Sequence, residues 1–64
     1  MKPGEVYVAN TPKDAHIHGH RFKVVREARM PDGNMGWLTV DEQDGSERFW
    51  AKAHLDAKAL TKAK

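Results

Sequence analysis

Two compact turn signals divide the middle of this chain, and they constrain its fold more than any other feature. The first covers residues 31–34 (Pro-Asp-Gly-Asn) and the second covers residues 43–46 (Gln-Asp-Gly-Ser). Gly and Asn tolerate the positive φ that tight turns between antiparallel strands require. Short segments on either side of these turns read as strands, with apolar positions recurring at a period of two. The pattern therefore predicts a meander of three consecutive antiparallel strands.

A further strand precedes the meander, and a short helical segment follows it. The expected strands cover residues 5–9, 21–28, 36–42 and 47–51. Residues 10–20 have no sustained period and contain Pro12 and Gly19, which predicts a long loop. From Lys52 onward the chain is rich in Ala, Leu and Lys, which favour helix.

The period of two also assigns a face to each side chain. The apolar side chains that can point inward together are Val6, Val8, Phe22, Val24, Leu38, Val40, Phe49 and Ala51. Leu55 would then cap one end of the core. Tyr7, Trp37 and Trp50 have the opposite parity, so we expect these three rings on the outside.

Four short strands that bury one common face close most economically into a small barrel. A chain of 64 residues supports only one small hydrophobic core. We therefore expect a single domain over residues 1–64, with an ordered core at about 3–56 and a basic Ala/Lys tail at 57–64.

The order of these elements resembles the Src-homology-3-like small β-barrel family. Residues 2–8 (Lys-Pro-Gly-Glu-Val-Tyr-Val) are similar to the entry strand of such barrels. The loops at 10–20, 31–35 and 43–46 would stand at the positions of the RT loop, the n-Src loop and the distal hairpin. Residues 49–55 resemble the last-strand segment that leads into a single helical turn. The resemblance implies an all-β antiparallel barrel of 4–5 strands with a short C-terminal helical turn.

The same resemblance implies a ligand groove. Trp37 falls where the peptide-binding members carry their ligand-binding tryptophan, and His54 falls at the same groove. The chain departs from the family pattern in several places. The early Ala-Leu-Tyr-Asp-Tyr signature is missing, Ala51 replaces the proline and His54 the tyrosine. His16, His18 and His20 replace the acidic residues of the RT loop, which leaves only Asp14.

Three closely spaced histidines form the most unusual string in the chain. In an extended segment, His16, His18 and His20 would place their imidazoles on one side, a geometry adequate for a divalent metal. Asp14 is the only carboxylate at a fitting spacing. We expect an exposed polar loop without an obligatory metal, and no cofactor.

Catalytic groups are not evident in the sequence. There is no cysteine, and Ser46 lies in a tight turn. General acid–base catalysis needs a pocket that perturbs a pKa, and a core this small encloses one with difficulty. We therefore expect a protein that is not an enzyme.

Two binding functions remain open. We favour a small protein-binding module, such as a phage- or plasmid-type adaptor or inhibitor that acts on a larger complex, because the formal charge is only +2. Its partner surface would centre on Trp37. The other expected members of this surface are Tyr7, Trp50 and His54 near the centre, with Arg26 and Lys52 at the rim.

The alternative is a nucleic-acid-associated barrel. Its phosphate contacts would come from Arg21, Lys23, Lys58 and Lys62. The exposed aromatic rings would stack on bases. No apolar stretch approaches the ~20 residues of a membrane span, so we expect no membrane partner. The absence of cysteine is compatible with a cytoplasmic protein.

Overall fold

The computed structural model describes residues 1–63 and shows a mostly β structure in one antiparallel sheet. Its elements are β1 (Val6–Ala9), β2 (Arg21–Arg29), β3 (Met35–Asp41), β4 (Glu47–Ala51), α1 (Lys52–Asp56) and β5 (Leu60–Lys62). The strands are ordered β4-β3-β2-β1-β5 across the sheet, and every neighbouring pair is antiparallel. The expected all-β class is confirmed, and all four expected strands are present.

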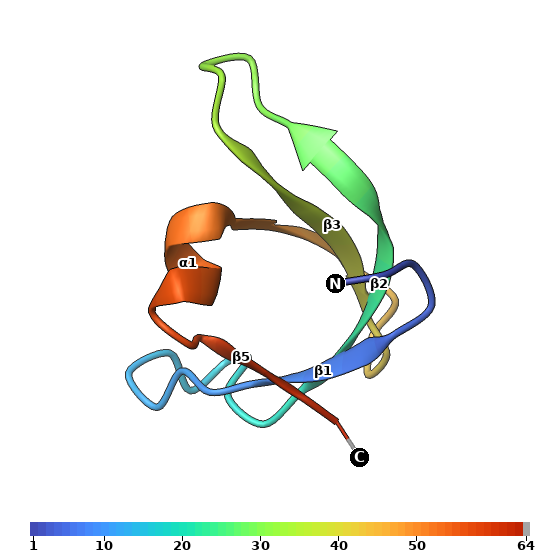
Figure 1. The fold of residues 1–64 in the computed structure, drawn as a ribbon. Helices are drawn as coiled ribbons and strands as arrows, with labels where there is room; N and C mark the ends of the chain where they lie inside the picture. Colours follow the sequence, from blue (N-terminus) through green and yellow to red (C-terminus); the bar gives the residue numbers. More distant parts are fainter. Residues whose placement is uncertain (64) are drawn as a thin grey trace.

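The sheet curls but does not close into a barrel. Its two outermost strands, β4 and β5, form no ladder with each other within residues 1–63. The short helix α1 connects them across this opening (Figure 1). None of the helical residues that the structure describes belongs to a segment long and apolar enough to cross a membrane.

The fifth strand lies in the segment that the sequence assigned to a basic tail. Leu60 pairs with Ala9 of β1, and Lys62 pairs with Tyr7. Leu60 is buried in the core, so part of the expected tail at 57–64 belongs to the sheet. The helix ends early because Lys58 adopts a left-handed φ of 58°, which turns the chain back toward β1. Residue 64 lies outside the described residues.

The structure reverses the predicted faces of three strands. Phe22 and Val24 point inward as expected, but Tyr7 lies opposite Phe22 and therefore shares the inner face. In β3 and β4, Trp37 lies opposite Trp50, and Trp50 is only 2% exposed. The expectation that Tyr7, Trp37 and Trp50 face outward is therefore wrong.

The residues expected inside β1, β3 and β4 lie instead on the outer face. Val8 lies opposite the exposed Arg21, and Leu38 lies opposite Phe49 on the side away from Trp50. The half-buried residues of this outer face are Val6, Val8, Leu38, Val40, Phe49 and Ala51. Thr39 and Asp41 take the inner positions of β3, where both are buried. Hydrogen bonds make this burial tolerable, since Thr39 Oγ1 donates to the Arg48 carbonyl at 2.9 Å.

Gly36 allows β3 and β4 to approach each other closely. A Cβ at this position would stand 2.2 Å from the Trp50 carbonyl oxygen and 2.6 Å from Cζ of Phe49. The Phe49 ring thus occupies the space that a side chain at position 36 would fill. Only glycine fits the ladder here.

A polar contact of four residues ties the ends of the chain together. The Glu5 carboxylate accepts hydrogen bonds from Lys62 Nζ at 2.8 Å, from the Lys2 backbone N–H at 2.6 Å and from the Tyr7 hydroxyl at 3.2 Å. The bond from Lys62, followed by the one from Lys2, lowers the pKa of Glu5 to about 2. This contact therefore holds β5 against the start of β1.

Replacing Trp50 with alanine should destabilise the fold far more than replacing Leu38. Trp50→Ala removes a fully buried ring and should cost roughly 3–5 kcal/mol. Leu38→Ala should cost less than half as much, because Leu38 is half-buried on the outer face. Urea unfolding followed by far-ultraviolet circular dichroism measures both. Equal costs would contradict the assignment of the inner face.

The Glu5 contact should make stability depend on acid. Because the pKa of Glu5 lies below its ordinary value of 4.5, the contact stabilises the fold above that pH and loses its effect as the pH falls toward 2. Glu5→Gln should therefore lower the thermal midpoint at about pH 6. It should also make the fall of the thermal midpoint between about pH 5 and pH 2 smaller. Glu47→Gln, at an exposed position of β4, is the matched control. An unchanged acid profile for Glu5→Gln would refute the assignment.

Candidate functional site

Trp50 is the centre of an aromatic group where β4 meets α1. Its ring packs edge-on against Phe22, with centroids 5.3 Å apart, and against His54 at 5.9 Å. The guanidinium carbon of Arg48 lies 5.2 Å from the Trp50 centroid. Trp37 is the ladder partner of Trp50 on the same face, so their Cβ atoms are about 5 Å apart. We call Trp37, Arg48, Trp50 and His54 the tryptophan surface.

The four members of this surface differ in exposure. Trp50 forms its buried base, Trp37 is half-buried, and Arg48 and His54 are exposed. The indole Nε1 of Trp50 is buried and has no hydrogen-bond acceptor within residues 1–63. A desolvated donor without an acceptor is costly, so this N–H is a local cost of burying Trp50.

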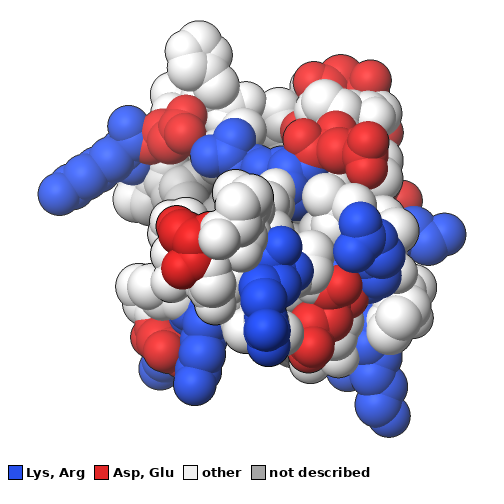
Figure 2. All heavy atoms as spheres, turned by 90° about the horizontal axis from the view of Figure 1, so that it is seen from above, with Lys and Arg blue, Asp and Glu red and all other residues white. Residues whose placement is uncertain are grey.

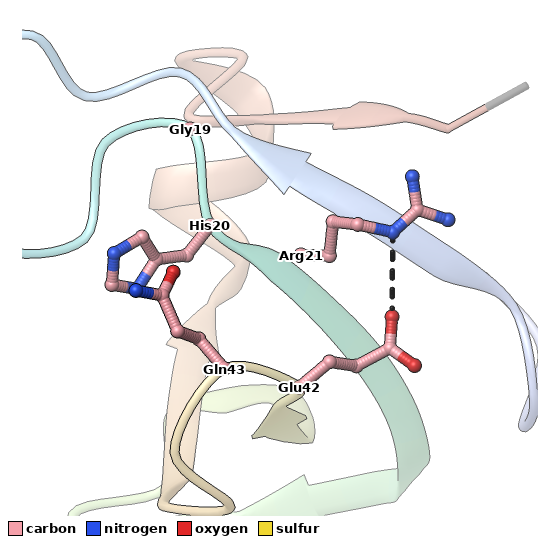
Figure 3. A pocket seen from close by; sticks show the side chains of 5 residues that line it. All are labelled: Gly19, His20, Arg21, Glu42 and Gln43. Atoms are coloured by element: carbon pink, nitrogen blue, oxygen red, sulfur yellow. Dashed lines mark hydrogen bonds and ion pairs between the residues drawn. The ribbon is translucent and has the colours of Figure 1, made fainter.

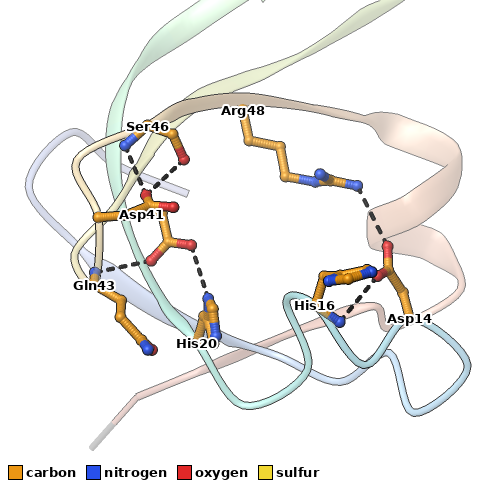
Figure 4. Close-up of polar contacts among 8 residues, drawn as sticks. Asp14, His16, His20, Asp41, Gln43, Ser46 and Arg48 are labelled. Atoms are coloured by element: carbon orange, nitrogen blue, oxygen red, sulfur yellow. Dashed lines mark hydrogen bonds and ion pairs between the residues drawn. The ribbon is translucent and has the colours of Figure 1, made fainter.

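Local contacts fix the two exposed members. His54 Nδ1 accepts the Ala51 N–H at 3.2 Å, so a neutral His54 carries its ring proton on Nε2. This bond closes the first turn of α1. Arg48 Nη2 lies 3.9 Å from Asp14 Oδ2, which links the loop at 10–20 to β4 (Figure 4).

The remaining residues predicted for a partner surface lie elsewhere, with one exception. Lys52 is exposed at the start of α1, next to the tryptophan surface in the chain. Tyr7 is half-buried against the core, and burial raises the pKa of its hydroxyl. Arg26 lies opposite Leu38, on the outer side of the sheet, and so faces away from Trp37. The structure thus brings together Trp37, Trp50 and His54 but not the full predicted set.

The four cations predicted for nucleic-acid binding do not form one surface. Arg21 and Lys23 are exposed on the outer side of β2, whereas Lys62 extends toward Glu5 and Lys58 lies in the turn after α1. Figure 2 shows Lys and Arg interspersed with Asp and Glu on the face in view. The face in that view is therefore not uniformly basic.

Two of these four cations also form ion pairs with carboxylates of the same chain. Lys62 Nζ lies 2.8 Å from Glu5 Oε2, and this bond raises the pKa of Lys62. Arg21 Nε lies 3.4 Å from Glu42 Oε1. Paired cations have less charge to offer a phosphate, which weakens the case for a phosphate-binding face.

The side chains of His16, His18 and His20 do not point to one common site. His18 Nδ1 accepts the Thr11 N–H at 3.1 Å, while His20 Nδ1 points to Asp41 Oδ2 at 2.8 Å. The His16 side chain is exposed. Within the described part of the chain, no three His, Cys, Asp or Glu side chains are grouped to hold a metal ion.

The contact between His20 and Asp41 is the polar feature that sequence reasoning missed. Asp41 is 2% exposed and also accepts the Gln43 N–H at 2.9 Å (Figure 4). The carboxylate therefore orients the imidazole and joins the loop at 10–20 to the turn after β3. No spacing signal identifies the pair, because 21 residues separate its members.

A shallow hollow of about 220 Å³ lies beside this pair (Figure 3). Its lining consists of Gly19, His20, Arg21, Glu42 and Gln43. Arg21 and Glu42 bind each other across it. None of the five lining residues is a Ser, Thr or Cys, so the oriented imidazole has no nucleophilic side chain to activate among them.

Comparisons with protein families, curated proteins and solved structures find no match to this chain.

Removing the Asp41 carboxylate should destabilise the fold. Asp41→Ala leaves the Gln43 N–H and the His20 ring N–H without an acceptor, which should cost roughly 1–3 kcal/mol. Glu42→Ala is the matched control, and loss of its exposed ion pair should cost less than about 1 kcal/mol. Chemical unfolding measures both, and comparable losses would show that the Asp41 contacts carry no special weight.

Proposed function

We propose that this chain is a non-enzymatic protein-binding module that holds a partner polypeptide on the tryptophan surface. The observation that carries the proposal is the half-buried Trp37 as the ladder partner of the buried Trp50, whose ring lies next to the exposed His54 and Arg48. Binding hot spots are enriched in Trp and Arg and lie around desolvated centres. The buried Trp50, with the more accessible Trp37, Arg48 and His54 around it, has this character.

We also propose that the fold is Src-homology-3-like. The five-strand antiparallel order and the helical turn directly after β4 support this assignment. The opening between β4 and β5 is a departure from a closed barrel. Under this assignment, Trp37 and His54 correspond to ligand-groove positions, which agrees with the surface chosen on exposure and packing.

The chemistry of the surface specifies the partner. An apolar side chain would pack on the half-buried Trp37. A carboxylate would suit Arg48, whose contact with Asp14 is long at 3.9 Å. A module of this size would act as an adaptor or an inhibitor by occupying such a segment of a larger complex.

Alanine at position 37 should separate binding from folding. Once a partner is isolated with nuclease-treated and untreated extracts, Trp37→Ala should weaken its affinity by roughly 30-fold or more. The thermal midpoint should move much less than in Trp50→Ala, because Trp37 is only half-buried. Leu38→Ala, one residue away on the other face, is the matched control and should bind normally.

Salt dependence then distinguishes the two binding functions. Affinity for a polypeptide on an aromatic surface should change little with ionic strength, whereas phosphate contacts make it fall steeply. A partner lost on nuclease treatment, with a steep salt dependence and full affinity in Trp37→Ala, would replace this proposal with nucleic-acid binding.

A further inference from the structure

The C-terminal half of β2, residues 25–29, has a free edge within residues 1–63. On the side away from β3, β1 pairs with β2 only from Arg21 to Lys23, and the last backbone contacts there join Val24 to Gly4 and Glu5. A β-bulge then interrupts the register with β3 between Val24 and Arg26. Beyond the bulge, the β2–β3 hairpin rises out of the body of the molecule (Figure 1).

The direction of the backbone groups along this edge follows from the ladder. The Met30 N–H donates to the Asn34 carbonyl at 2.8 Å, so Met30 faces β3. In an antiparallel ladder the direction alternates from residue to residue. Ala28 therefore also faces β3, and the N–H and C=O groups of Glu27 and Arg29 face the free edge. Such an edge is a template for pairing with another strand.

Exposed apolar side chains bracket the same edge. Val25 and Met30 are 42% and 41% exposed, and they are the large apolar side chains that residues 1–63 leave most open. They stand at the two ends of the segment that contains Glu27 and Arg29. Within residues 1–63, no strand or helix covers the backbone edge or these two apolar side chains.

We propose that two copies of this chain join through this edge, with β2 antiparallel to β2 about a twofold axis at Ala28. In this register Glu27 of each copy lies opposite Arg29 of the other copy, which creates two reciprocal ion pairs. Neither side chain forms an ion pair within residues 1–63. Opposite charges directly across an antiparallel pair are stabilising. The interface is isologous, as a symmetric dimer requires.

The other symmetric registers are unfavourable. An axis at position 27 places Glu27 against Glu27, and an axis at position 29 places Arg29 against Arg29. An axis between two residues would oppose an edge-facing residue to one that faces β3, so the hydrogen bonds would not form. The small side chain of Ala28 suits the close approach on the axis.

Two existing side-chain contacts must give way. Arg29 Nε donates to Met35 Sδ at 3.0 Å, and the ion pair with Glu27 of the other copy would replace this weak bond. Arg26 Nη1 donates to the Glu27 carbonyl at 3.3 Å, and the incoming strand would replace this bond with a backbone N–H. Since the paired segment is short, we expect weak association that becomes visible only at high protein concentration. The inference stands independently of the proposed function, because it uses no residue of the tryptophan surface.

Charge reversal provides the test. Sedimentation equilibrium from about 10 µM to about 1 mM should show a monomer–dimer equilibrium for the natural chain. Glu27→Arg or Arg29→Glu alone should weaken self-association by about tenfold or more, since both ion pairs become repulsive. An equimolar mixture of the two variants should associate again, because each Arg then meets a Glu of the other copy. Lys13→Glu, in an exposed loop, is the control and should leave association unchanged.

A second measurement uses the natural chain alone. The amide hydrogens of Glu27 and Arg29 should exchange with solvent more slowly at high protein concentration than at low concentration. A monomer throughout the range, concentration-independent exchange, full association of either single variant, or no recovery in the mixture would each overturn the proposal.

Discussion

Burial of Trp50 determines which side of the sheet becomes the core. Its ring packs edge-on against Phe22, the other large aromatic that is fully buried. Because antiparallel pairing places opposite residues on one face, Trp50 brings Trp37 to the inner side and Phe22 brings Tyr7 there. The valines of β1 and Leu38 then have only the outer face. One aromatic contact thus fixes the orientation of four strands.

The existence of the first four strands was predictable because turn chemistry is local. The faces were not, since β3 and β4 carry apolar side chains on both parities, with Leu38 next to Trp37 and Phe49 next to Trp50. Two polar residues take inner positions of β3, which a hydropathy pattern alone does not predict. Thr39 and Asp41 are acceptable inside only because the folded chain supplies partners from β4, the loop at 10–20 and the turn after β3.

The missed strand and the scattered site have related causes. β5 has only three residues, and its partner β1 lies more than 50 residues earlier in the chain, so no local pattern reveals it. Trp37, Trp50 and His54 were predicted as neighbours and lie together, because ladder register and the start of α1 determine their positions. Tyr7 and Arg26 were grouped with them on an assumed common face. Arg26 lies opposite Leu38 on the outer side, and so on the other face from Trp37. Tyr7 does share the inner face with Trp37, but it stands on β1, which β2 separates from β3.

The bulge in β2 connects the proposed binding surface with the proposed dimer edge. By bending β2 after Val24, it carries the hairpin beyond β1 and frees the edge of Glu27 and Arg29. Across the same hairpin, Trp37 lies opposite Glu27 and therefore shares its face. A twofold axis normal to the joined sheet preserves faces, so the tryptophan surfaces of two copies would lie on the same side. A partner with two binding segments could then engage both copies at once, and the weak self-association would contribute through effective concentration rather than through contact area.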